Sequence, residues 1–507
     1  MVNYLDLLRL AAPEIIVVIT AVVVLAVDLS ALRNLEPRLR FGIGAIIAAA
    51  GCAAAIAWML VLPQQGNFGQ MLVADPVTQI VSVGILALAI FTVALCSGAD
   101  FTSHAGEYYA LLLLAAAGML FLASSEDVLM IFLSLELTSL TLYVLTAFNK
   151  RSARSAEAAL KYFLFGGTAA AFTLFGLSWL YGITGSTNLG EAAEAIKAAH
   201  LLPGSPVLPR TSLDPLLAGA LVMTVAGFGF KVAAAPFHLW APDAYEGAPL
   251  PSAAFIASAS KVAGFFIFAK VMRIGFAGVG GCAAWGQFAS GWKPLLAVLA
   301  IVSMILGNLA ALAQRSVRRL LAYSAIAHAG YMLLGIIGHQ KQSLAALLYY
   351  ALTYGLTTIG AFGVVSMVQA ETGGDRLEDF AGLSRRAPVL AWSMMVFMLS
   401  LAGIPPLAGF LGKFYLFTSV LGSGGQDLGL LWLVLLAVAM SVVSLYYYLL
   451  VLKQVFVRPA SEPAGFKAAP LVARVVVAAL ALAVLALGCA PNLLLQPLTE
   501  AVTRTSF

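Results

Sequence analysis

Long apolar runs separated by short polar stretches recur along almost the whole chain. A bilayer core is crossed by about 20 apolar residues in helical form. Runs of this kind centre on 10–29, 41–62, 77–97, 108–124, 127–148, 157–183, 215–240, 252–275, 295–314, 320–338, 343–370, 388–422, 428–456 and 471–490. The pattern therefore predicts an all-α polytopic membrane protein of about fourteen transmembrane helices, counted here in chain order.

Helix-breaking residues interrupt two of these runs. Pro236 lies in the seventh, and the sequence Gly403-Ile404-Pro405-Pro406 lies in the twelfth. Proline removes a backbone donor and clashes with the preceding turn, so we expect helices 7 and 12 to be broken. The two breaks are five helices apart, and five is odd, so two five-helix units offset by that number would have opposite orientations in the membrane. This is the plan of an inverted repeat.

These breaks also suggest how the chain is divided. We expect helices 1–3 in residues 1–100, a first five-helix repeat (helices 4–8) in 108–275, and a second, inverted repeat (helices 9–13) in 295–456. Helix 14 and a C-terminal tail follow in 471–507. The one long polar loop, around 184–215, has room for a short surface helix but not for a cofactor-binding domain.

Basic residues gather in the loops that follow odd-numbered helices. These loops hold Arg33, Arg38, Arg40, Lys150, Arg151, Arg154, Arg315, Arg318, Arg319, Arg376, Arg385, Arg386, Lys453, Arg458, Lys467 and Arg474. Fewer lie on the other side: Arg9, Lys197, Arg210, Lys270, Arg273, Lys293, Lys341 and Arg504. Because positive residues accumulate on the cytoplasmic side, both termini are expected to be periplasmic.

Composition agrees with the membrane interpretation. Hydrophobic residues make up 62% of the 507 residues and charged residues only 10%, whereas soluble proteins carry about 25% charged residues. The net charge of +5 is small and spread over short clusters, so nucleic-acid binding is not expected. The four cysteines are isolated from one another, which argues against an iron–sulfur or zinc site in this chain.

A few charged residues lie inside the apolar runs. They are Lys161, Lys231, Lys261, Lys413 and Glu136. A charge at the bilayer centre costs about 2.5–3.5 kcal/mol on insertion scales, so these groups should face protein or internal water. Lys161 is near the start of its run and could instead snorkel to the interface. Burial disfavours a charged lysine and a nearby carboxylate favours it, so a lysine with a movable partner is a switchable proton site.

Other polar groups in the runs are open to two interpretations. His328 either relays protons, since histidine titrates near neutral pH, or makes a structural helix contact. The same holds for His238, and a metal site joining it to Asp243 or Glu246 is not favoured. These two acids are expected near the cytoplasmic surface. The tyrosines at 446–448 are expected to anchor the interface or to pack.

Four stretches carry a family resemblance: residues 134–140 (SLELTSL), 231–249 (KVAAAPFHLWAPDAYEGAP), 320–331 (LLAYSAIAHAGY) and 401–414 (LAGIPPLAGFLGKF). They resemble the antiporter-like subunits of respiratory complex I over nearly the whole chain. The N-type subunit of bacterial NADH–quinone oxidoreductase is the nearest pattern, because Lys413 stands where the M-type subunit has glutamate. The chain ends soon after helix 14, where the L-type subunit continues into a long lateral helix.

The resemblance implies a proton path. Glu136 on helix 5 would pair with Lys231 on helix 7, and Lys161 on helix 6 would modulate that pair. Lys261 on helix 8 would link two half-channels. Lys413 on helix 12 would exchange protons with the far side, and His328 would lie on the hydrated axis between these lysines.

The resemblance also implies a setting. The chain would be a non-redox, proton-translocating subunit of an NADH:quinone oxidoreductase in a bacterial inner membrane, driven by quinone reduction elsewhere in the complex. It would hold no cofactor itself, while NADH, FMN, iron–sulfur clusters and quinone would bind in the parent complex. Its partners would be the other membrane and peripheral subunits and the lipid bilayer, with no nucleic acid.

Two other functions remain open from the sequence. One is a subunit of a multi-subunit Mrp-type cation/proton antiporter, which shares the helix-7 and helix-12 motifs. The other is a structural membrane scaffold whose lysines only hold helices together.

Overall fold

The computed structural model describes residues 8–61, 66–68, 71–97, 101–201, 213–338, 340–422, 429–459 and 470–505. The basic residues Arg210 and Lys467, and residues 202–212 of the long loop, lie outside these ranges.

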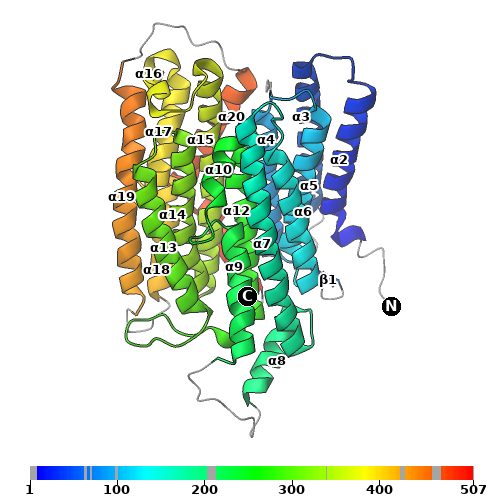
Figure 1. Ribbon diagram of the computed structural model, residues 1–507, viewed down its shortest axis with the longest axis vertical. Coiled ribbons are helices and arrows are strands. Elements are labelled where there is room, and N and C mark those ends of the chain that lie inside the picture. The colour runs from blue at the N-terminus through cyan, green and yellow to red at the C-terminus, as the bar shows by residue number, and fades with distance from the viewer. Residues whose placement is uncertain are drawn as a thin grey trace.

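The protein is a bundle of helices that run roughly parallel or antiparallel to the long axis (Figure 1). Its first half contains α2 (Ala12–Ser30), α3 (Pro37–Val61), α4 (Pro76–Leu95), α5 (Ala105–Ser124), α6 (Val128–Thr146), α7 (Ala153–Thr184), α8 (Leu189–Leu201), α9 (Pro215–Lys231), α10 (Trp240–Gly247), α11 (Leu250–Ala257) and α12 (Ala259–Lys270). Its second half contains α13 (Trp292–Leu312), α14 (Val317–Ile337), α15 (Lys341–Thr372), α16 (Leu383–Arg386), α17 (Pro388–Ala402), α18 (Ala408–Leu421), α19 (Leu431–Phe456), α20 (Leu471–Cys489) and α21 (Asn492–Arg504).

The all-α polytopic class is confirmed. Within the described residues, twelve helices are long and apolar enough to cross a membrane. The predicted runs 7 and 12 contribute shorter apolar helices, α9, α17 and α18. Two three-residue strands, β1 (Gly66–Phe68) and β2 (Leu72–Ala74), pair antiparallel near the start of α4. The predicted C-terminal tail contains a further helix, α21, which packs against α15 and α4.

Both predicted breaks are present. Helix α9 ends at Lys231 and α10 begins at Trp240, so Pro236 lies in the gap between them. Helix α17 ends at Ala402 and α18 begins at Ala408. A further interruption separates α11 from α12 at Ser258, and a π-helical turn over Val271–Gly275 follows α12. The sequence reasoning missed both of these features, because neither contains proline.

Two places in the bundle have the same backbone pattern. The N-terminus of α6 lies beside the end of α7, where Val128 N–H donates to Thr187 O at 2.8 Å. The N-terminus of α14 lies beside the end of α15, where Val317 N–H donates to Asp375 O at 2.8 Å. An isolated antiparallel bridge accompanies each contact, and α7 and α15 each have 32 residues.

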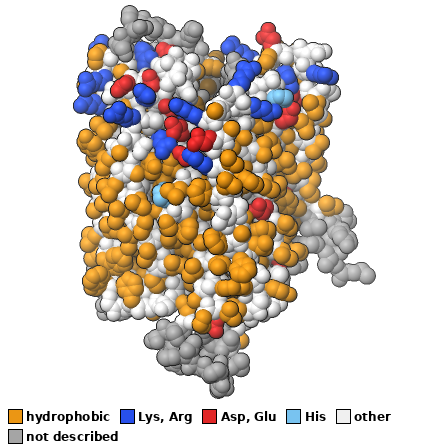
Figure 2. Space-filling model, in the orientation of Figure 1, with side chains coloured by type: hydrophobic (Ala, Val, Ile, Leu, Met, Phe, Trp, Pro, Cys, Tyr) orange, Lys and Arg blue, Asp and Glu red, His pale blue; other side chains and the backbone are white. Residues whose placement is uncertain are grey.

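Charged side chains gather at one end of the molecule. Figure 2 shows most of the visible Lys and Arg side chains at the upper end, above a broad apolar band. Figure 1 shows the α2–α3 connection and α16 at this same end. The apolar band is the surface that a bilayer would surround.

Candidate functional site

Glu136 and Lys231 face one cavity between α6, α7 and α9. Lys231 is the last residue of α9 and is 5% exposed. Its Nζ donates to Ser139 Oγ at 3.1 Å, and Ser139 lies one turn after Glu136 on α6. Glu136 and Lys231 line a cavity of about 300 Å³, yet no ion pair within 4.0 Å joins these two described residues. The structure therefore places the predicted partners on one cavity, with Lys231 hydrogen-bonded to Ser139 and not paired with Glu136.

Lys261 is a buried lysine on α12, the helix that packs against Lys231. Its side chain is 2% exposed, its Nζ donates to Ala325 O on α14, and it lies 5.7 Å from the ring centroid of Tyr354 on α15. Gly264 lies one turn after Lys261 on α12. A Cβ placed on Gly264 would lie 3.4 Å from Lys231 Cγ. The α12 helix therefore packs against Lys231 one turn from Lys261, while Lys261 itself contacts α14 and α15.

Lys413 is bound by the broken end of α17. It is 5% exposed, and its Nζ donates to Leu401 O at 2.9 Å, to Ala402 O at 3.1 Å and to Ser441 Oγ at 2.9 Å. Carbonyls at a helix C-terminus have no intrahelical partner and carry partial negative charge. Gly403, with φ +87, turns the chain away and leaves these carbonyls open to the lysine. The break therefore creates an ammonium site within the bundle.

His328 on α14 lies between Lys261 and Lys413. It is 2% exposed, with Nδ1 2.6 Å from Tyr350 Oη and Nε2 3.1 Å from Tyr448 Oη. Its ring also packs on Tyr354, centroid to centroid 4.9 Å. Tyr354 is the ring that Lys261 contacts.

A second aromatic ring, that of Tyr331, connects His328 with Lys413. His328 packs edge-on against Tyr331 at 5.7 Å, and Lys413 Nζ lies 5.1 Å from the Tyr331 ring centroid. The rings of Tyr354 and Tyr331 thus connect Lys261, His328 and Lys413 through successive side-chain contacts. We call the set Glu136, Lys231, Lys261, His328 and Lys413 the polar axis.

Lys161 lies apart from the polar axis. Its side chain is 42% exposed, and its Nζ pairs with Glu157 at 2.7 Å and with Asp243 at 2.9 Å. Neither Glu136 nor Lys231 is among its partners in the described chain. Of the two interpretations of Lys161, this position matches snorkelling toward the interface and not burial within the run, because α7 turns the side chain toward α10.

Asp243 belongs to a network of ion pairs that joins the two halves of the bundle. Arg319 on α14 lies 3.0 Å from Asp243 and 2.7 Å from Glu246, both on α10. Burial opposes ionisation of Asp243, but hydrogen bonds from Lys161 and Arg319 outweigh it and hold the pKa of Asp243 below its ordinary value. His238, which precedes α10, makes no metal cluster with these acids in the described chain.

Sequence reasoning missed two buried lysines. Lys270 was assigned to a loop, yet it ends α12 with 0% exposure and contacts Glu126 at 3.4 Å and the carbonyls of Ala123 and Ser125. Lys293, at the start of α13, is 5% exposed. The signal was available for Lys270, because an apolar run continues on both sides of it.

The tyrosines at 446–448 do not act as one group. Tyr446 is 61% exposed, but Tyr447 and Tyr448 are fully buried. Tyr447 Oη donates to Asn308 Oδ1 at 2.9 Å, and Tyr448 contacts His328. The interfacial-anchor interpretation is therefore wrong for Tyr447 and Tyr448, which pack and form hydrogen bonds inside the bundle.

These features define a polytopic membrane protein with an internal polar axis suited to carrying ions. The transmembrane family described as NADH:quinone oxidoreductase/Mrp antiporter matches residues 125–444. NADH-quinone oxidoreductase subunit N 2 of Acidobacterium capsulatum is 52% identical over 506 residues, covering 98% of this chain and 99% of the relative. A second subunit N 2, of Herpetosiphon aurantiacus, is 41% identical over 86% of this chain and 81% of its own length. The chain belongs to the subunit N family of NADH-quinone oxidoreductase.

Solved structures agree with this assignment. A chain of respiratory complex I from Thermus thermophilus superposes with a TM-score of 0.76 at 37% identity, covering 96% of this chain and 98% of that one. A chain of the Mrp complex from Dietzia superposes with a TM-score of 0.78 at 20% identity, covering 98% and 97%. At 20% identity, the similarity to the Mrp chain shows only that the two chains share a fold.

Proposed function

We propose that this chain moves protons as the N-type membrane subunit of an NADH-quinone oxidoreductase, along the polar axis. The observation that carries the proposal is the continuity of that axis. Lys231, which lines the cavity with Glu136, packs against α12 one turn from Lys261, and aromatic and histidine side chains link Lys261 to Lys413. Buried ammonium groups are costly in a bilayer, so a connected row of them favours a transport role over scaffolding.

Glu136 and Lys231 share a cavity without forming an ion pair, which supports a role for this pair as a switch for the proton on Lys231. With Ser139 as its hydrogen-bond partner, Lys231 is less stabilised in its charged form than a direct ion pair would make it. Closing the pair would favour a proton on Lys231, and opening it would favour release toward Lys261. Energy from quinone reduction elsewhere in the complex would drive this exchange.

Lys161 takes a different role in this proposal. Its link to Asp243, and through Asp243 to Arg319, connects α7 and α10 with α14 at the charged end of the bundle. A shift in this network would move α10 and with it the break that follows Lys231. Lys161 would thus act on the Glu136–Lys231 pair through α10, as a positioning residue.

The matched backbone patterns at α6–α7 and α14–α15 support the two five-helix repeats, 108–275 and 295–456. We further propose that the charged end is cytoplasmic and both termini are periplasmic, in a bacterial inner membrane. Partners would be the other subunits of the complex. FMN, iron–sulfur clusters, NADH and quinone would bind in those subunits.

The test is Lys231→Ala in the whole complex, reconstituted in liposomes after assembly has been verified by subunit composition. Proton uptake should fall tenfold or more, because a positioned proton-transfer group contributes about 100- to 10,000-fold. Lys453→Ala, an exposed lysine on α19, is the matched control and should pump normally. Normal pumping by an assembled Lys231→Ala complex would refute the proposal. Co-purification with cation/proton antiporter subunits and without redox subunits would instead support the Mrp alternative.

A further inference from the structure

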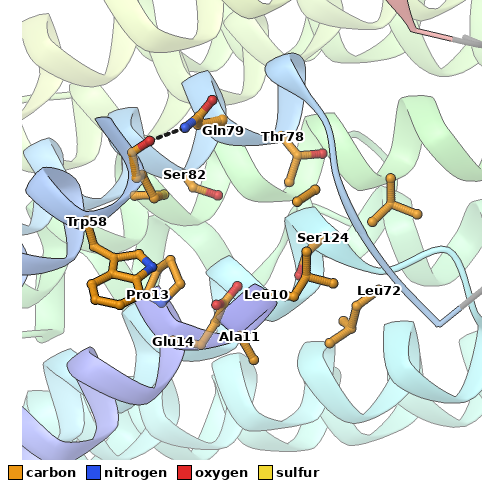
Figure 3. A pocket seen from close by; sticks show the side chains of 13 residues that line it. Leu10, Ala11, Pro13, Glu14, Trp58, Leu72, Thr78, Gln79, Ser82 and Ser124 are labelled. Carbon is orange, nitrogen blue, oxygen red and sulfur yellow. Dashed lines mark hydrogen bonds between the residues drawn. The ribbon is translucent and has the colours of Figure 1, made fainter. Parts of the chain in front are cut away.

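A second polar cavity lies among the first helices, away from the polar axis. It is bounded by the start of α2, the end of α3, β2, the start of α4 and the end of α5, and has an empty volume of about 510 Å³ (Figure 3). Its polar lining includes Glu14, Trp58, Thr78, Ser82 and Ser124. In Figure 3 the carboxylate of Glu14 points into the space that Ser82 and Ser124 face. Sequence analysis singled out Glu136 as the acid inside a run and missed Glu14.

Three buried atoms of this cavity have no hydrogen-bond partner among the described residues. They are Glu14 Oε2, Trp58 Nε1 and Thr78 Oγ1. Glu14 is 6% exposed and Thr78 4%. More than nine in ten buried polar groups in proteins are paired, and an unpaired one costs about 1–3 kcal/mol. Three together in one cavity give a polar ligand three places to form hydrogen bonds.

The three atoms specify the chemistry of that occupant. No Lys, Arg or His is among the lining residues that the structure describes, so these residues supply no cation to Glu14. A carboxylate oxygen requires a donor, and the hydroxyls of Thr78, Ser82 and Ser124 can accept further N–H groups. Trp58 Nε1 is a donor only, so it requires an acceptor. A ligand with a primary ammonium and a nearby oxygen acceptor satisfies all of these groups.

The remaining walls and the surroundings indicate how such a ligand is held. Gln79 also lines the cavity and donates to Met59 O, and the other lining residues are apolar, among them Leu10, Pro13, Leu72 and Val73. The residues directly after Met59, Leu60 and Val61, are 66% and 75% exposed at the end of a membrane-crossing helix. An amphiphile lying along α3 can therefore reach the cavity with its head group.

We propose that the Glu14 cavity binds the primary-ammonium head group of a phospholipid, of the phosphatidylethanolamine type. The ammonium donates to Glu14 and to hydroxyls of the cavity, and a phosphate oxygen accepts from Trp58 Nε1. The bound lipid ties α2, α3, α4 and α5 together at this end of the bundle. This site is independent of the polar axis and of proton movement along it.

The test is lipid retention by the intact complex. Wild-type and Glu14→Gln complexes are equilibrated with vesicles of equal phosphatidylethanolamine and phosphatidylglycerol content, and lipid bound to the released subunit is measured by native mass spectrometry. The wild-type subunit should retain phosphatidylethanolamine in preference to phosphatidylglycerol. Glu14→Gln should lose that preference by about tenfold or more, because a hydrogen bond to a charged group is removed.

Glu36→Gln, an exposed glutamate beyond α2, is the control and should retain lipid as the wild type does. Trp58→Phe keeps an aromatic ring and removes the Nε1–H donor. It tests the site if the Glu14→Gln complex fails to assemble, and it should weaken the retention of phosphatidylethanolamine. Adding excess free phosphoethanolamine tests whether the site recognises the head group of a lipid or the free compound. Displacement of the lipid by phosphoethanolamine would overturn the claim that an acyl chain is needed. Equal retention in wild type, Glu14→Gln and Trp58→Phe would overturn the proposal. The Lys231→Ala complex should retain the lipid as the wild type does. The lipid test therefore gives a result even if the proposal about proton movement is refuted.

Discussion

Ser441→Ala tests whether Lys413 exchanges protons on the path. The hydroxyl of Ser441 is one of three acceptors around Lys413 Nζ, at 2.9 Å, and the other two are backbone carbonyls that no side-chain change removes. A hydrogen bond to a charged group is worth about 1.5–3 kcal/mol. Since 1.4 kcal/mol is a factor of ten, losing it should disfavour the protonated state of Lys413 by about tenfold to a hundredfold.

The consequence is measurable in proteoliposomes. We expect Ser441→Ala to lower proton uptake per NADH oxidised, with the assembled complex present in normal amount. Ser444→Ala is the matched control on the same helix, because Ser444 Oγ donates to Ser441 O and does not contact Lys413. Wild-type pumping by Ser441→Ala, together with loss of pumping in Ser444→Ala, would refute the reasoning.

Two further predictions concern the breaks and the ion-pair network. Gly403→Ala should destabilise the subunit by about 1–2 kcal/mol, because φ is +87 and the new Cβ would lie 3.2 Å from Lys413 Cδ; an unchanged thermal unfolding midpoint would contradict this. Asp243→Asn should lower that midpoint at pH 7, because Lys161 and Arg319 lose a partner. The pKa of Asp243 is depressed, so its stabilisation is full above the ordinary aspartate pKa of about 3.9 and is lost as pH falls below it. The difference between Asp243→Asn and wild type should therefore vanish in strong acid.

The sequence was sufficient for the features that local chemistry dictates. Proline and glycine predicted both helix breaks, and the apolar runs predicted the class of fold. The cost of a charge in the bilayer singled out Lys231, Lys261 and Lys413, which the structure shows to be buried. The direction in which each side chain points was beyond the sequence, because it depends on how the helices pack.

Two errors and one open interpretation share this cause. For Lys161 the sequence left burial and snorkelling both open, and only the packing shows that its face of α7 is turned to Asp243 and partly exposed. Lys270 was treated as a loop residue, although α12 and the following π-helical turn hold it inside the bundle. Glu14 escaped notice because the residues of α3, α4 and α5 that surround it, such as Trp58, Thr78 and Ser124, are distant from it in sequence. A pattern along one helix does not reveal which neighbours cover it.

The proton movement of an assembled complex carrying Lys261→Met is the most direct test of the central claim. Lys261 is on α12, which packs against Lys231, and its Nζ contacts the Tyr354 ring beside His328; methionine fills a similar volume without a proton site. The measurement is proton uptake into liposomes per NADH oxidised, with subunit composition checked in parallel. The account predicts a marked fall in this ratio or in the coupled rate. Proton uptake equal to wild type, in a fully assembled complex, would contradict it.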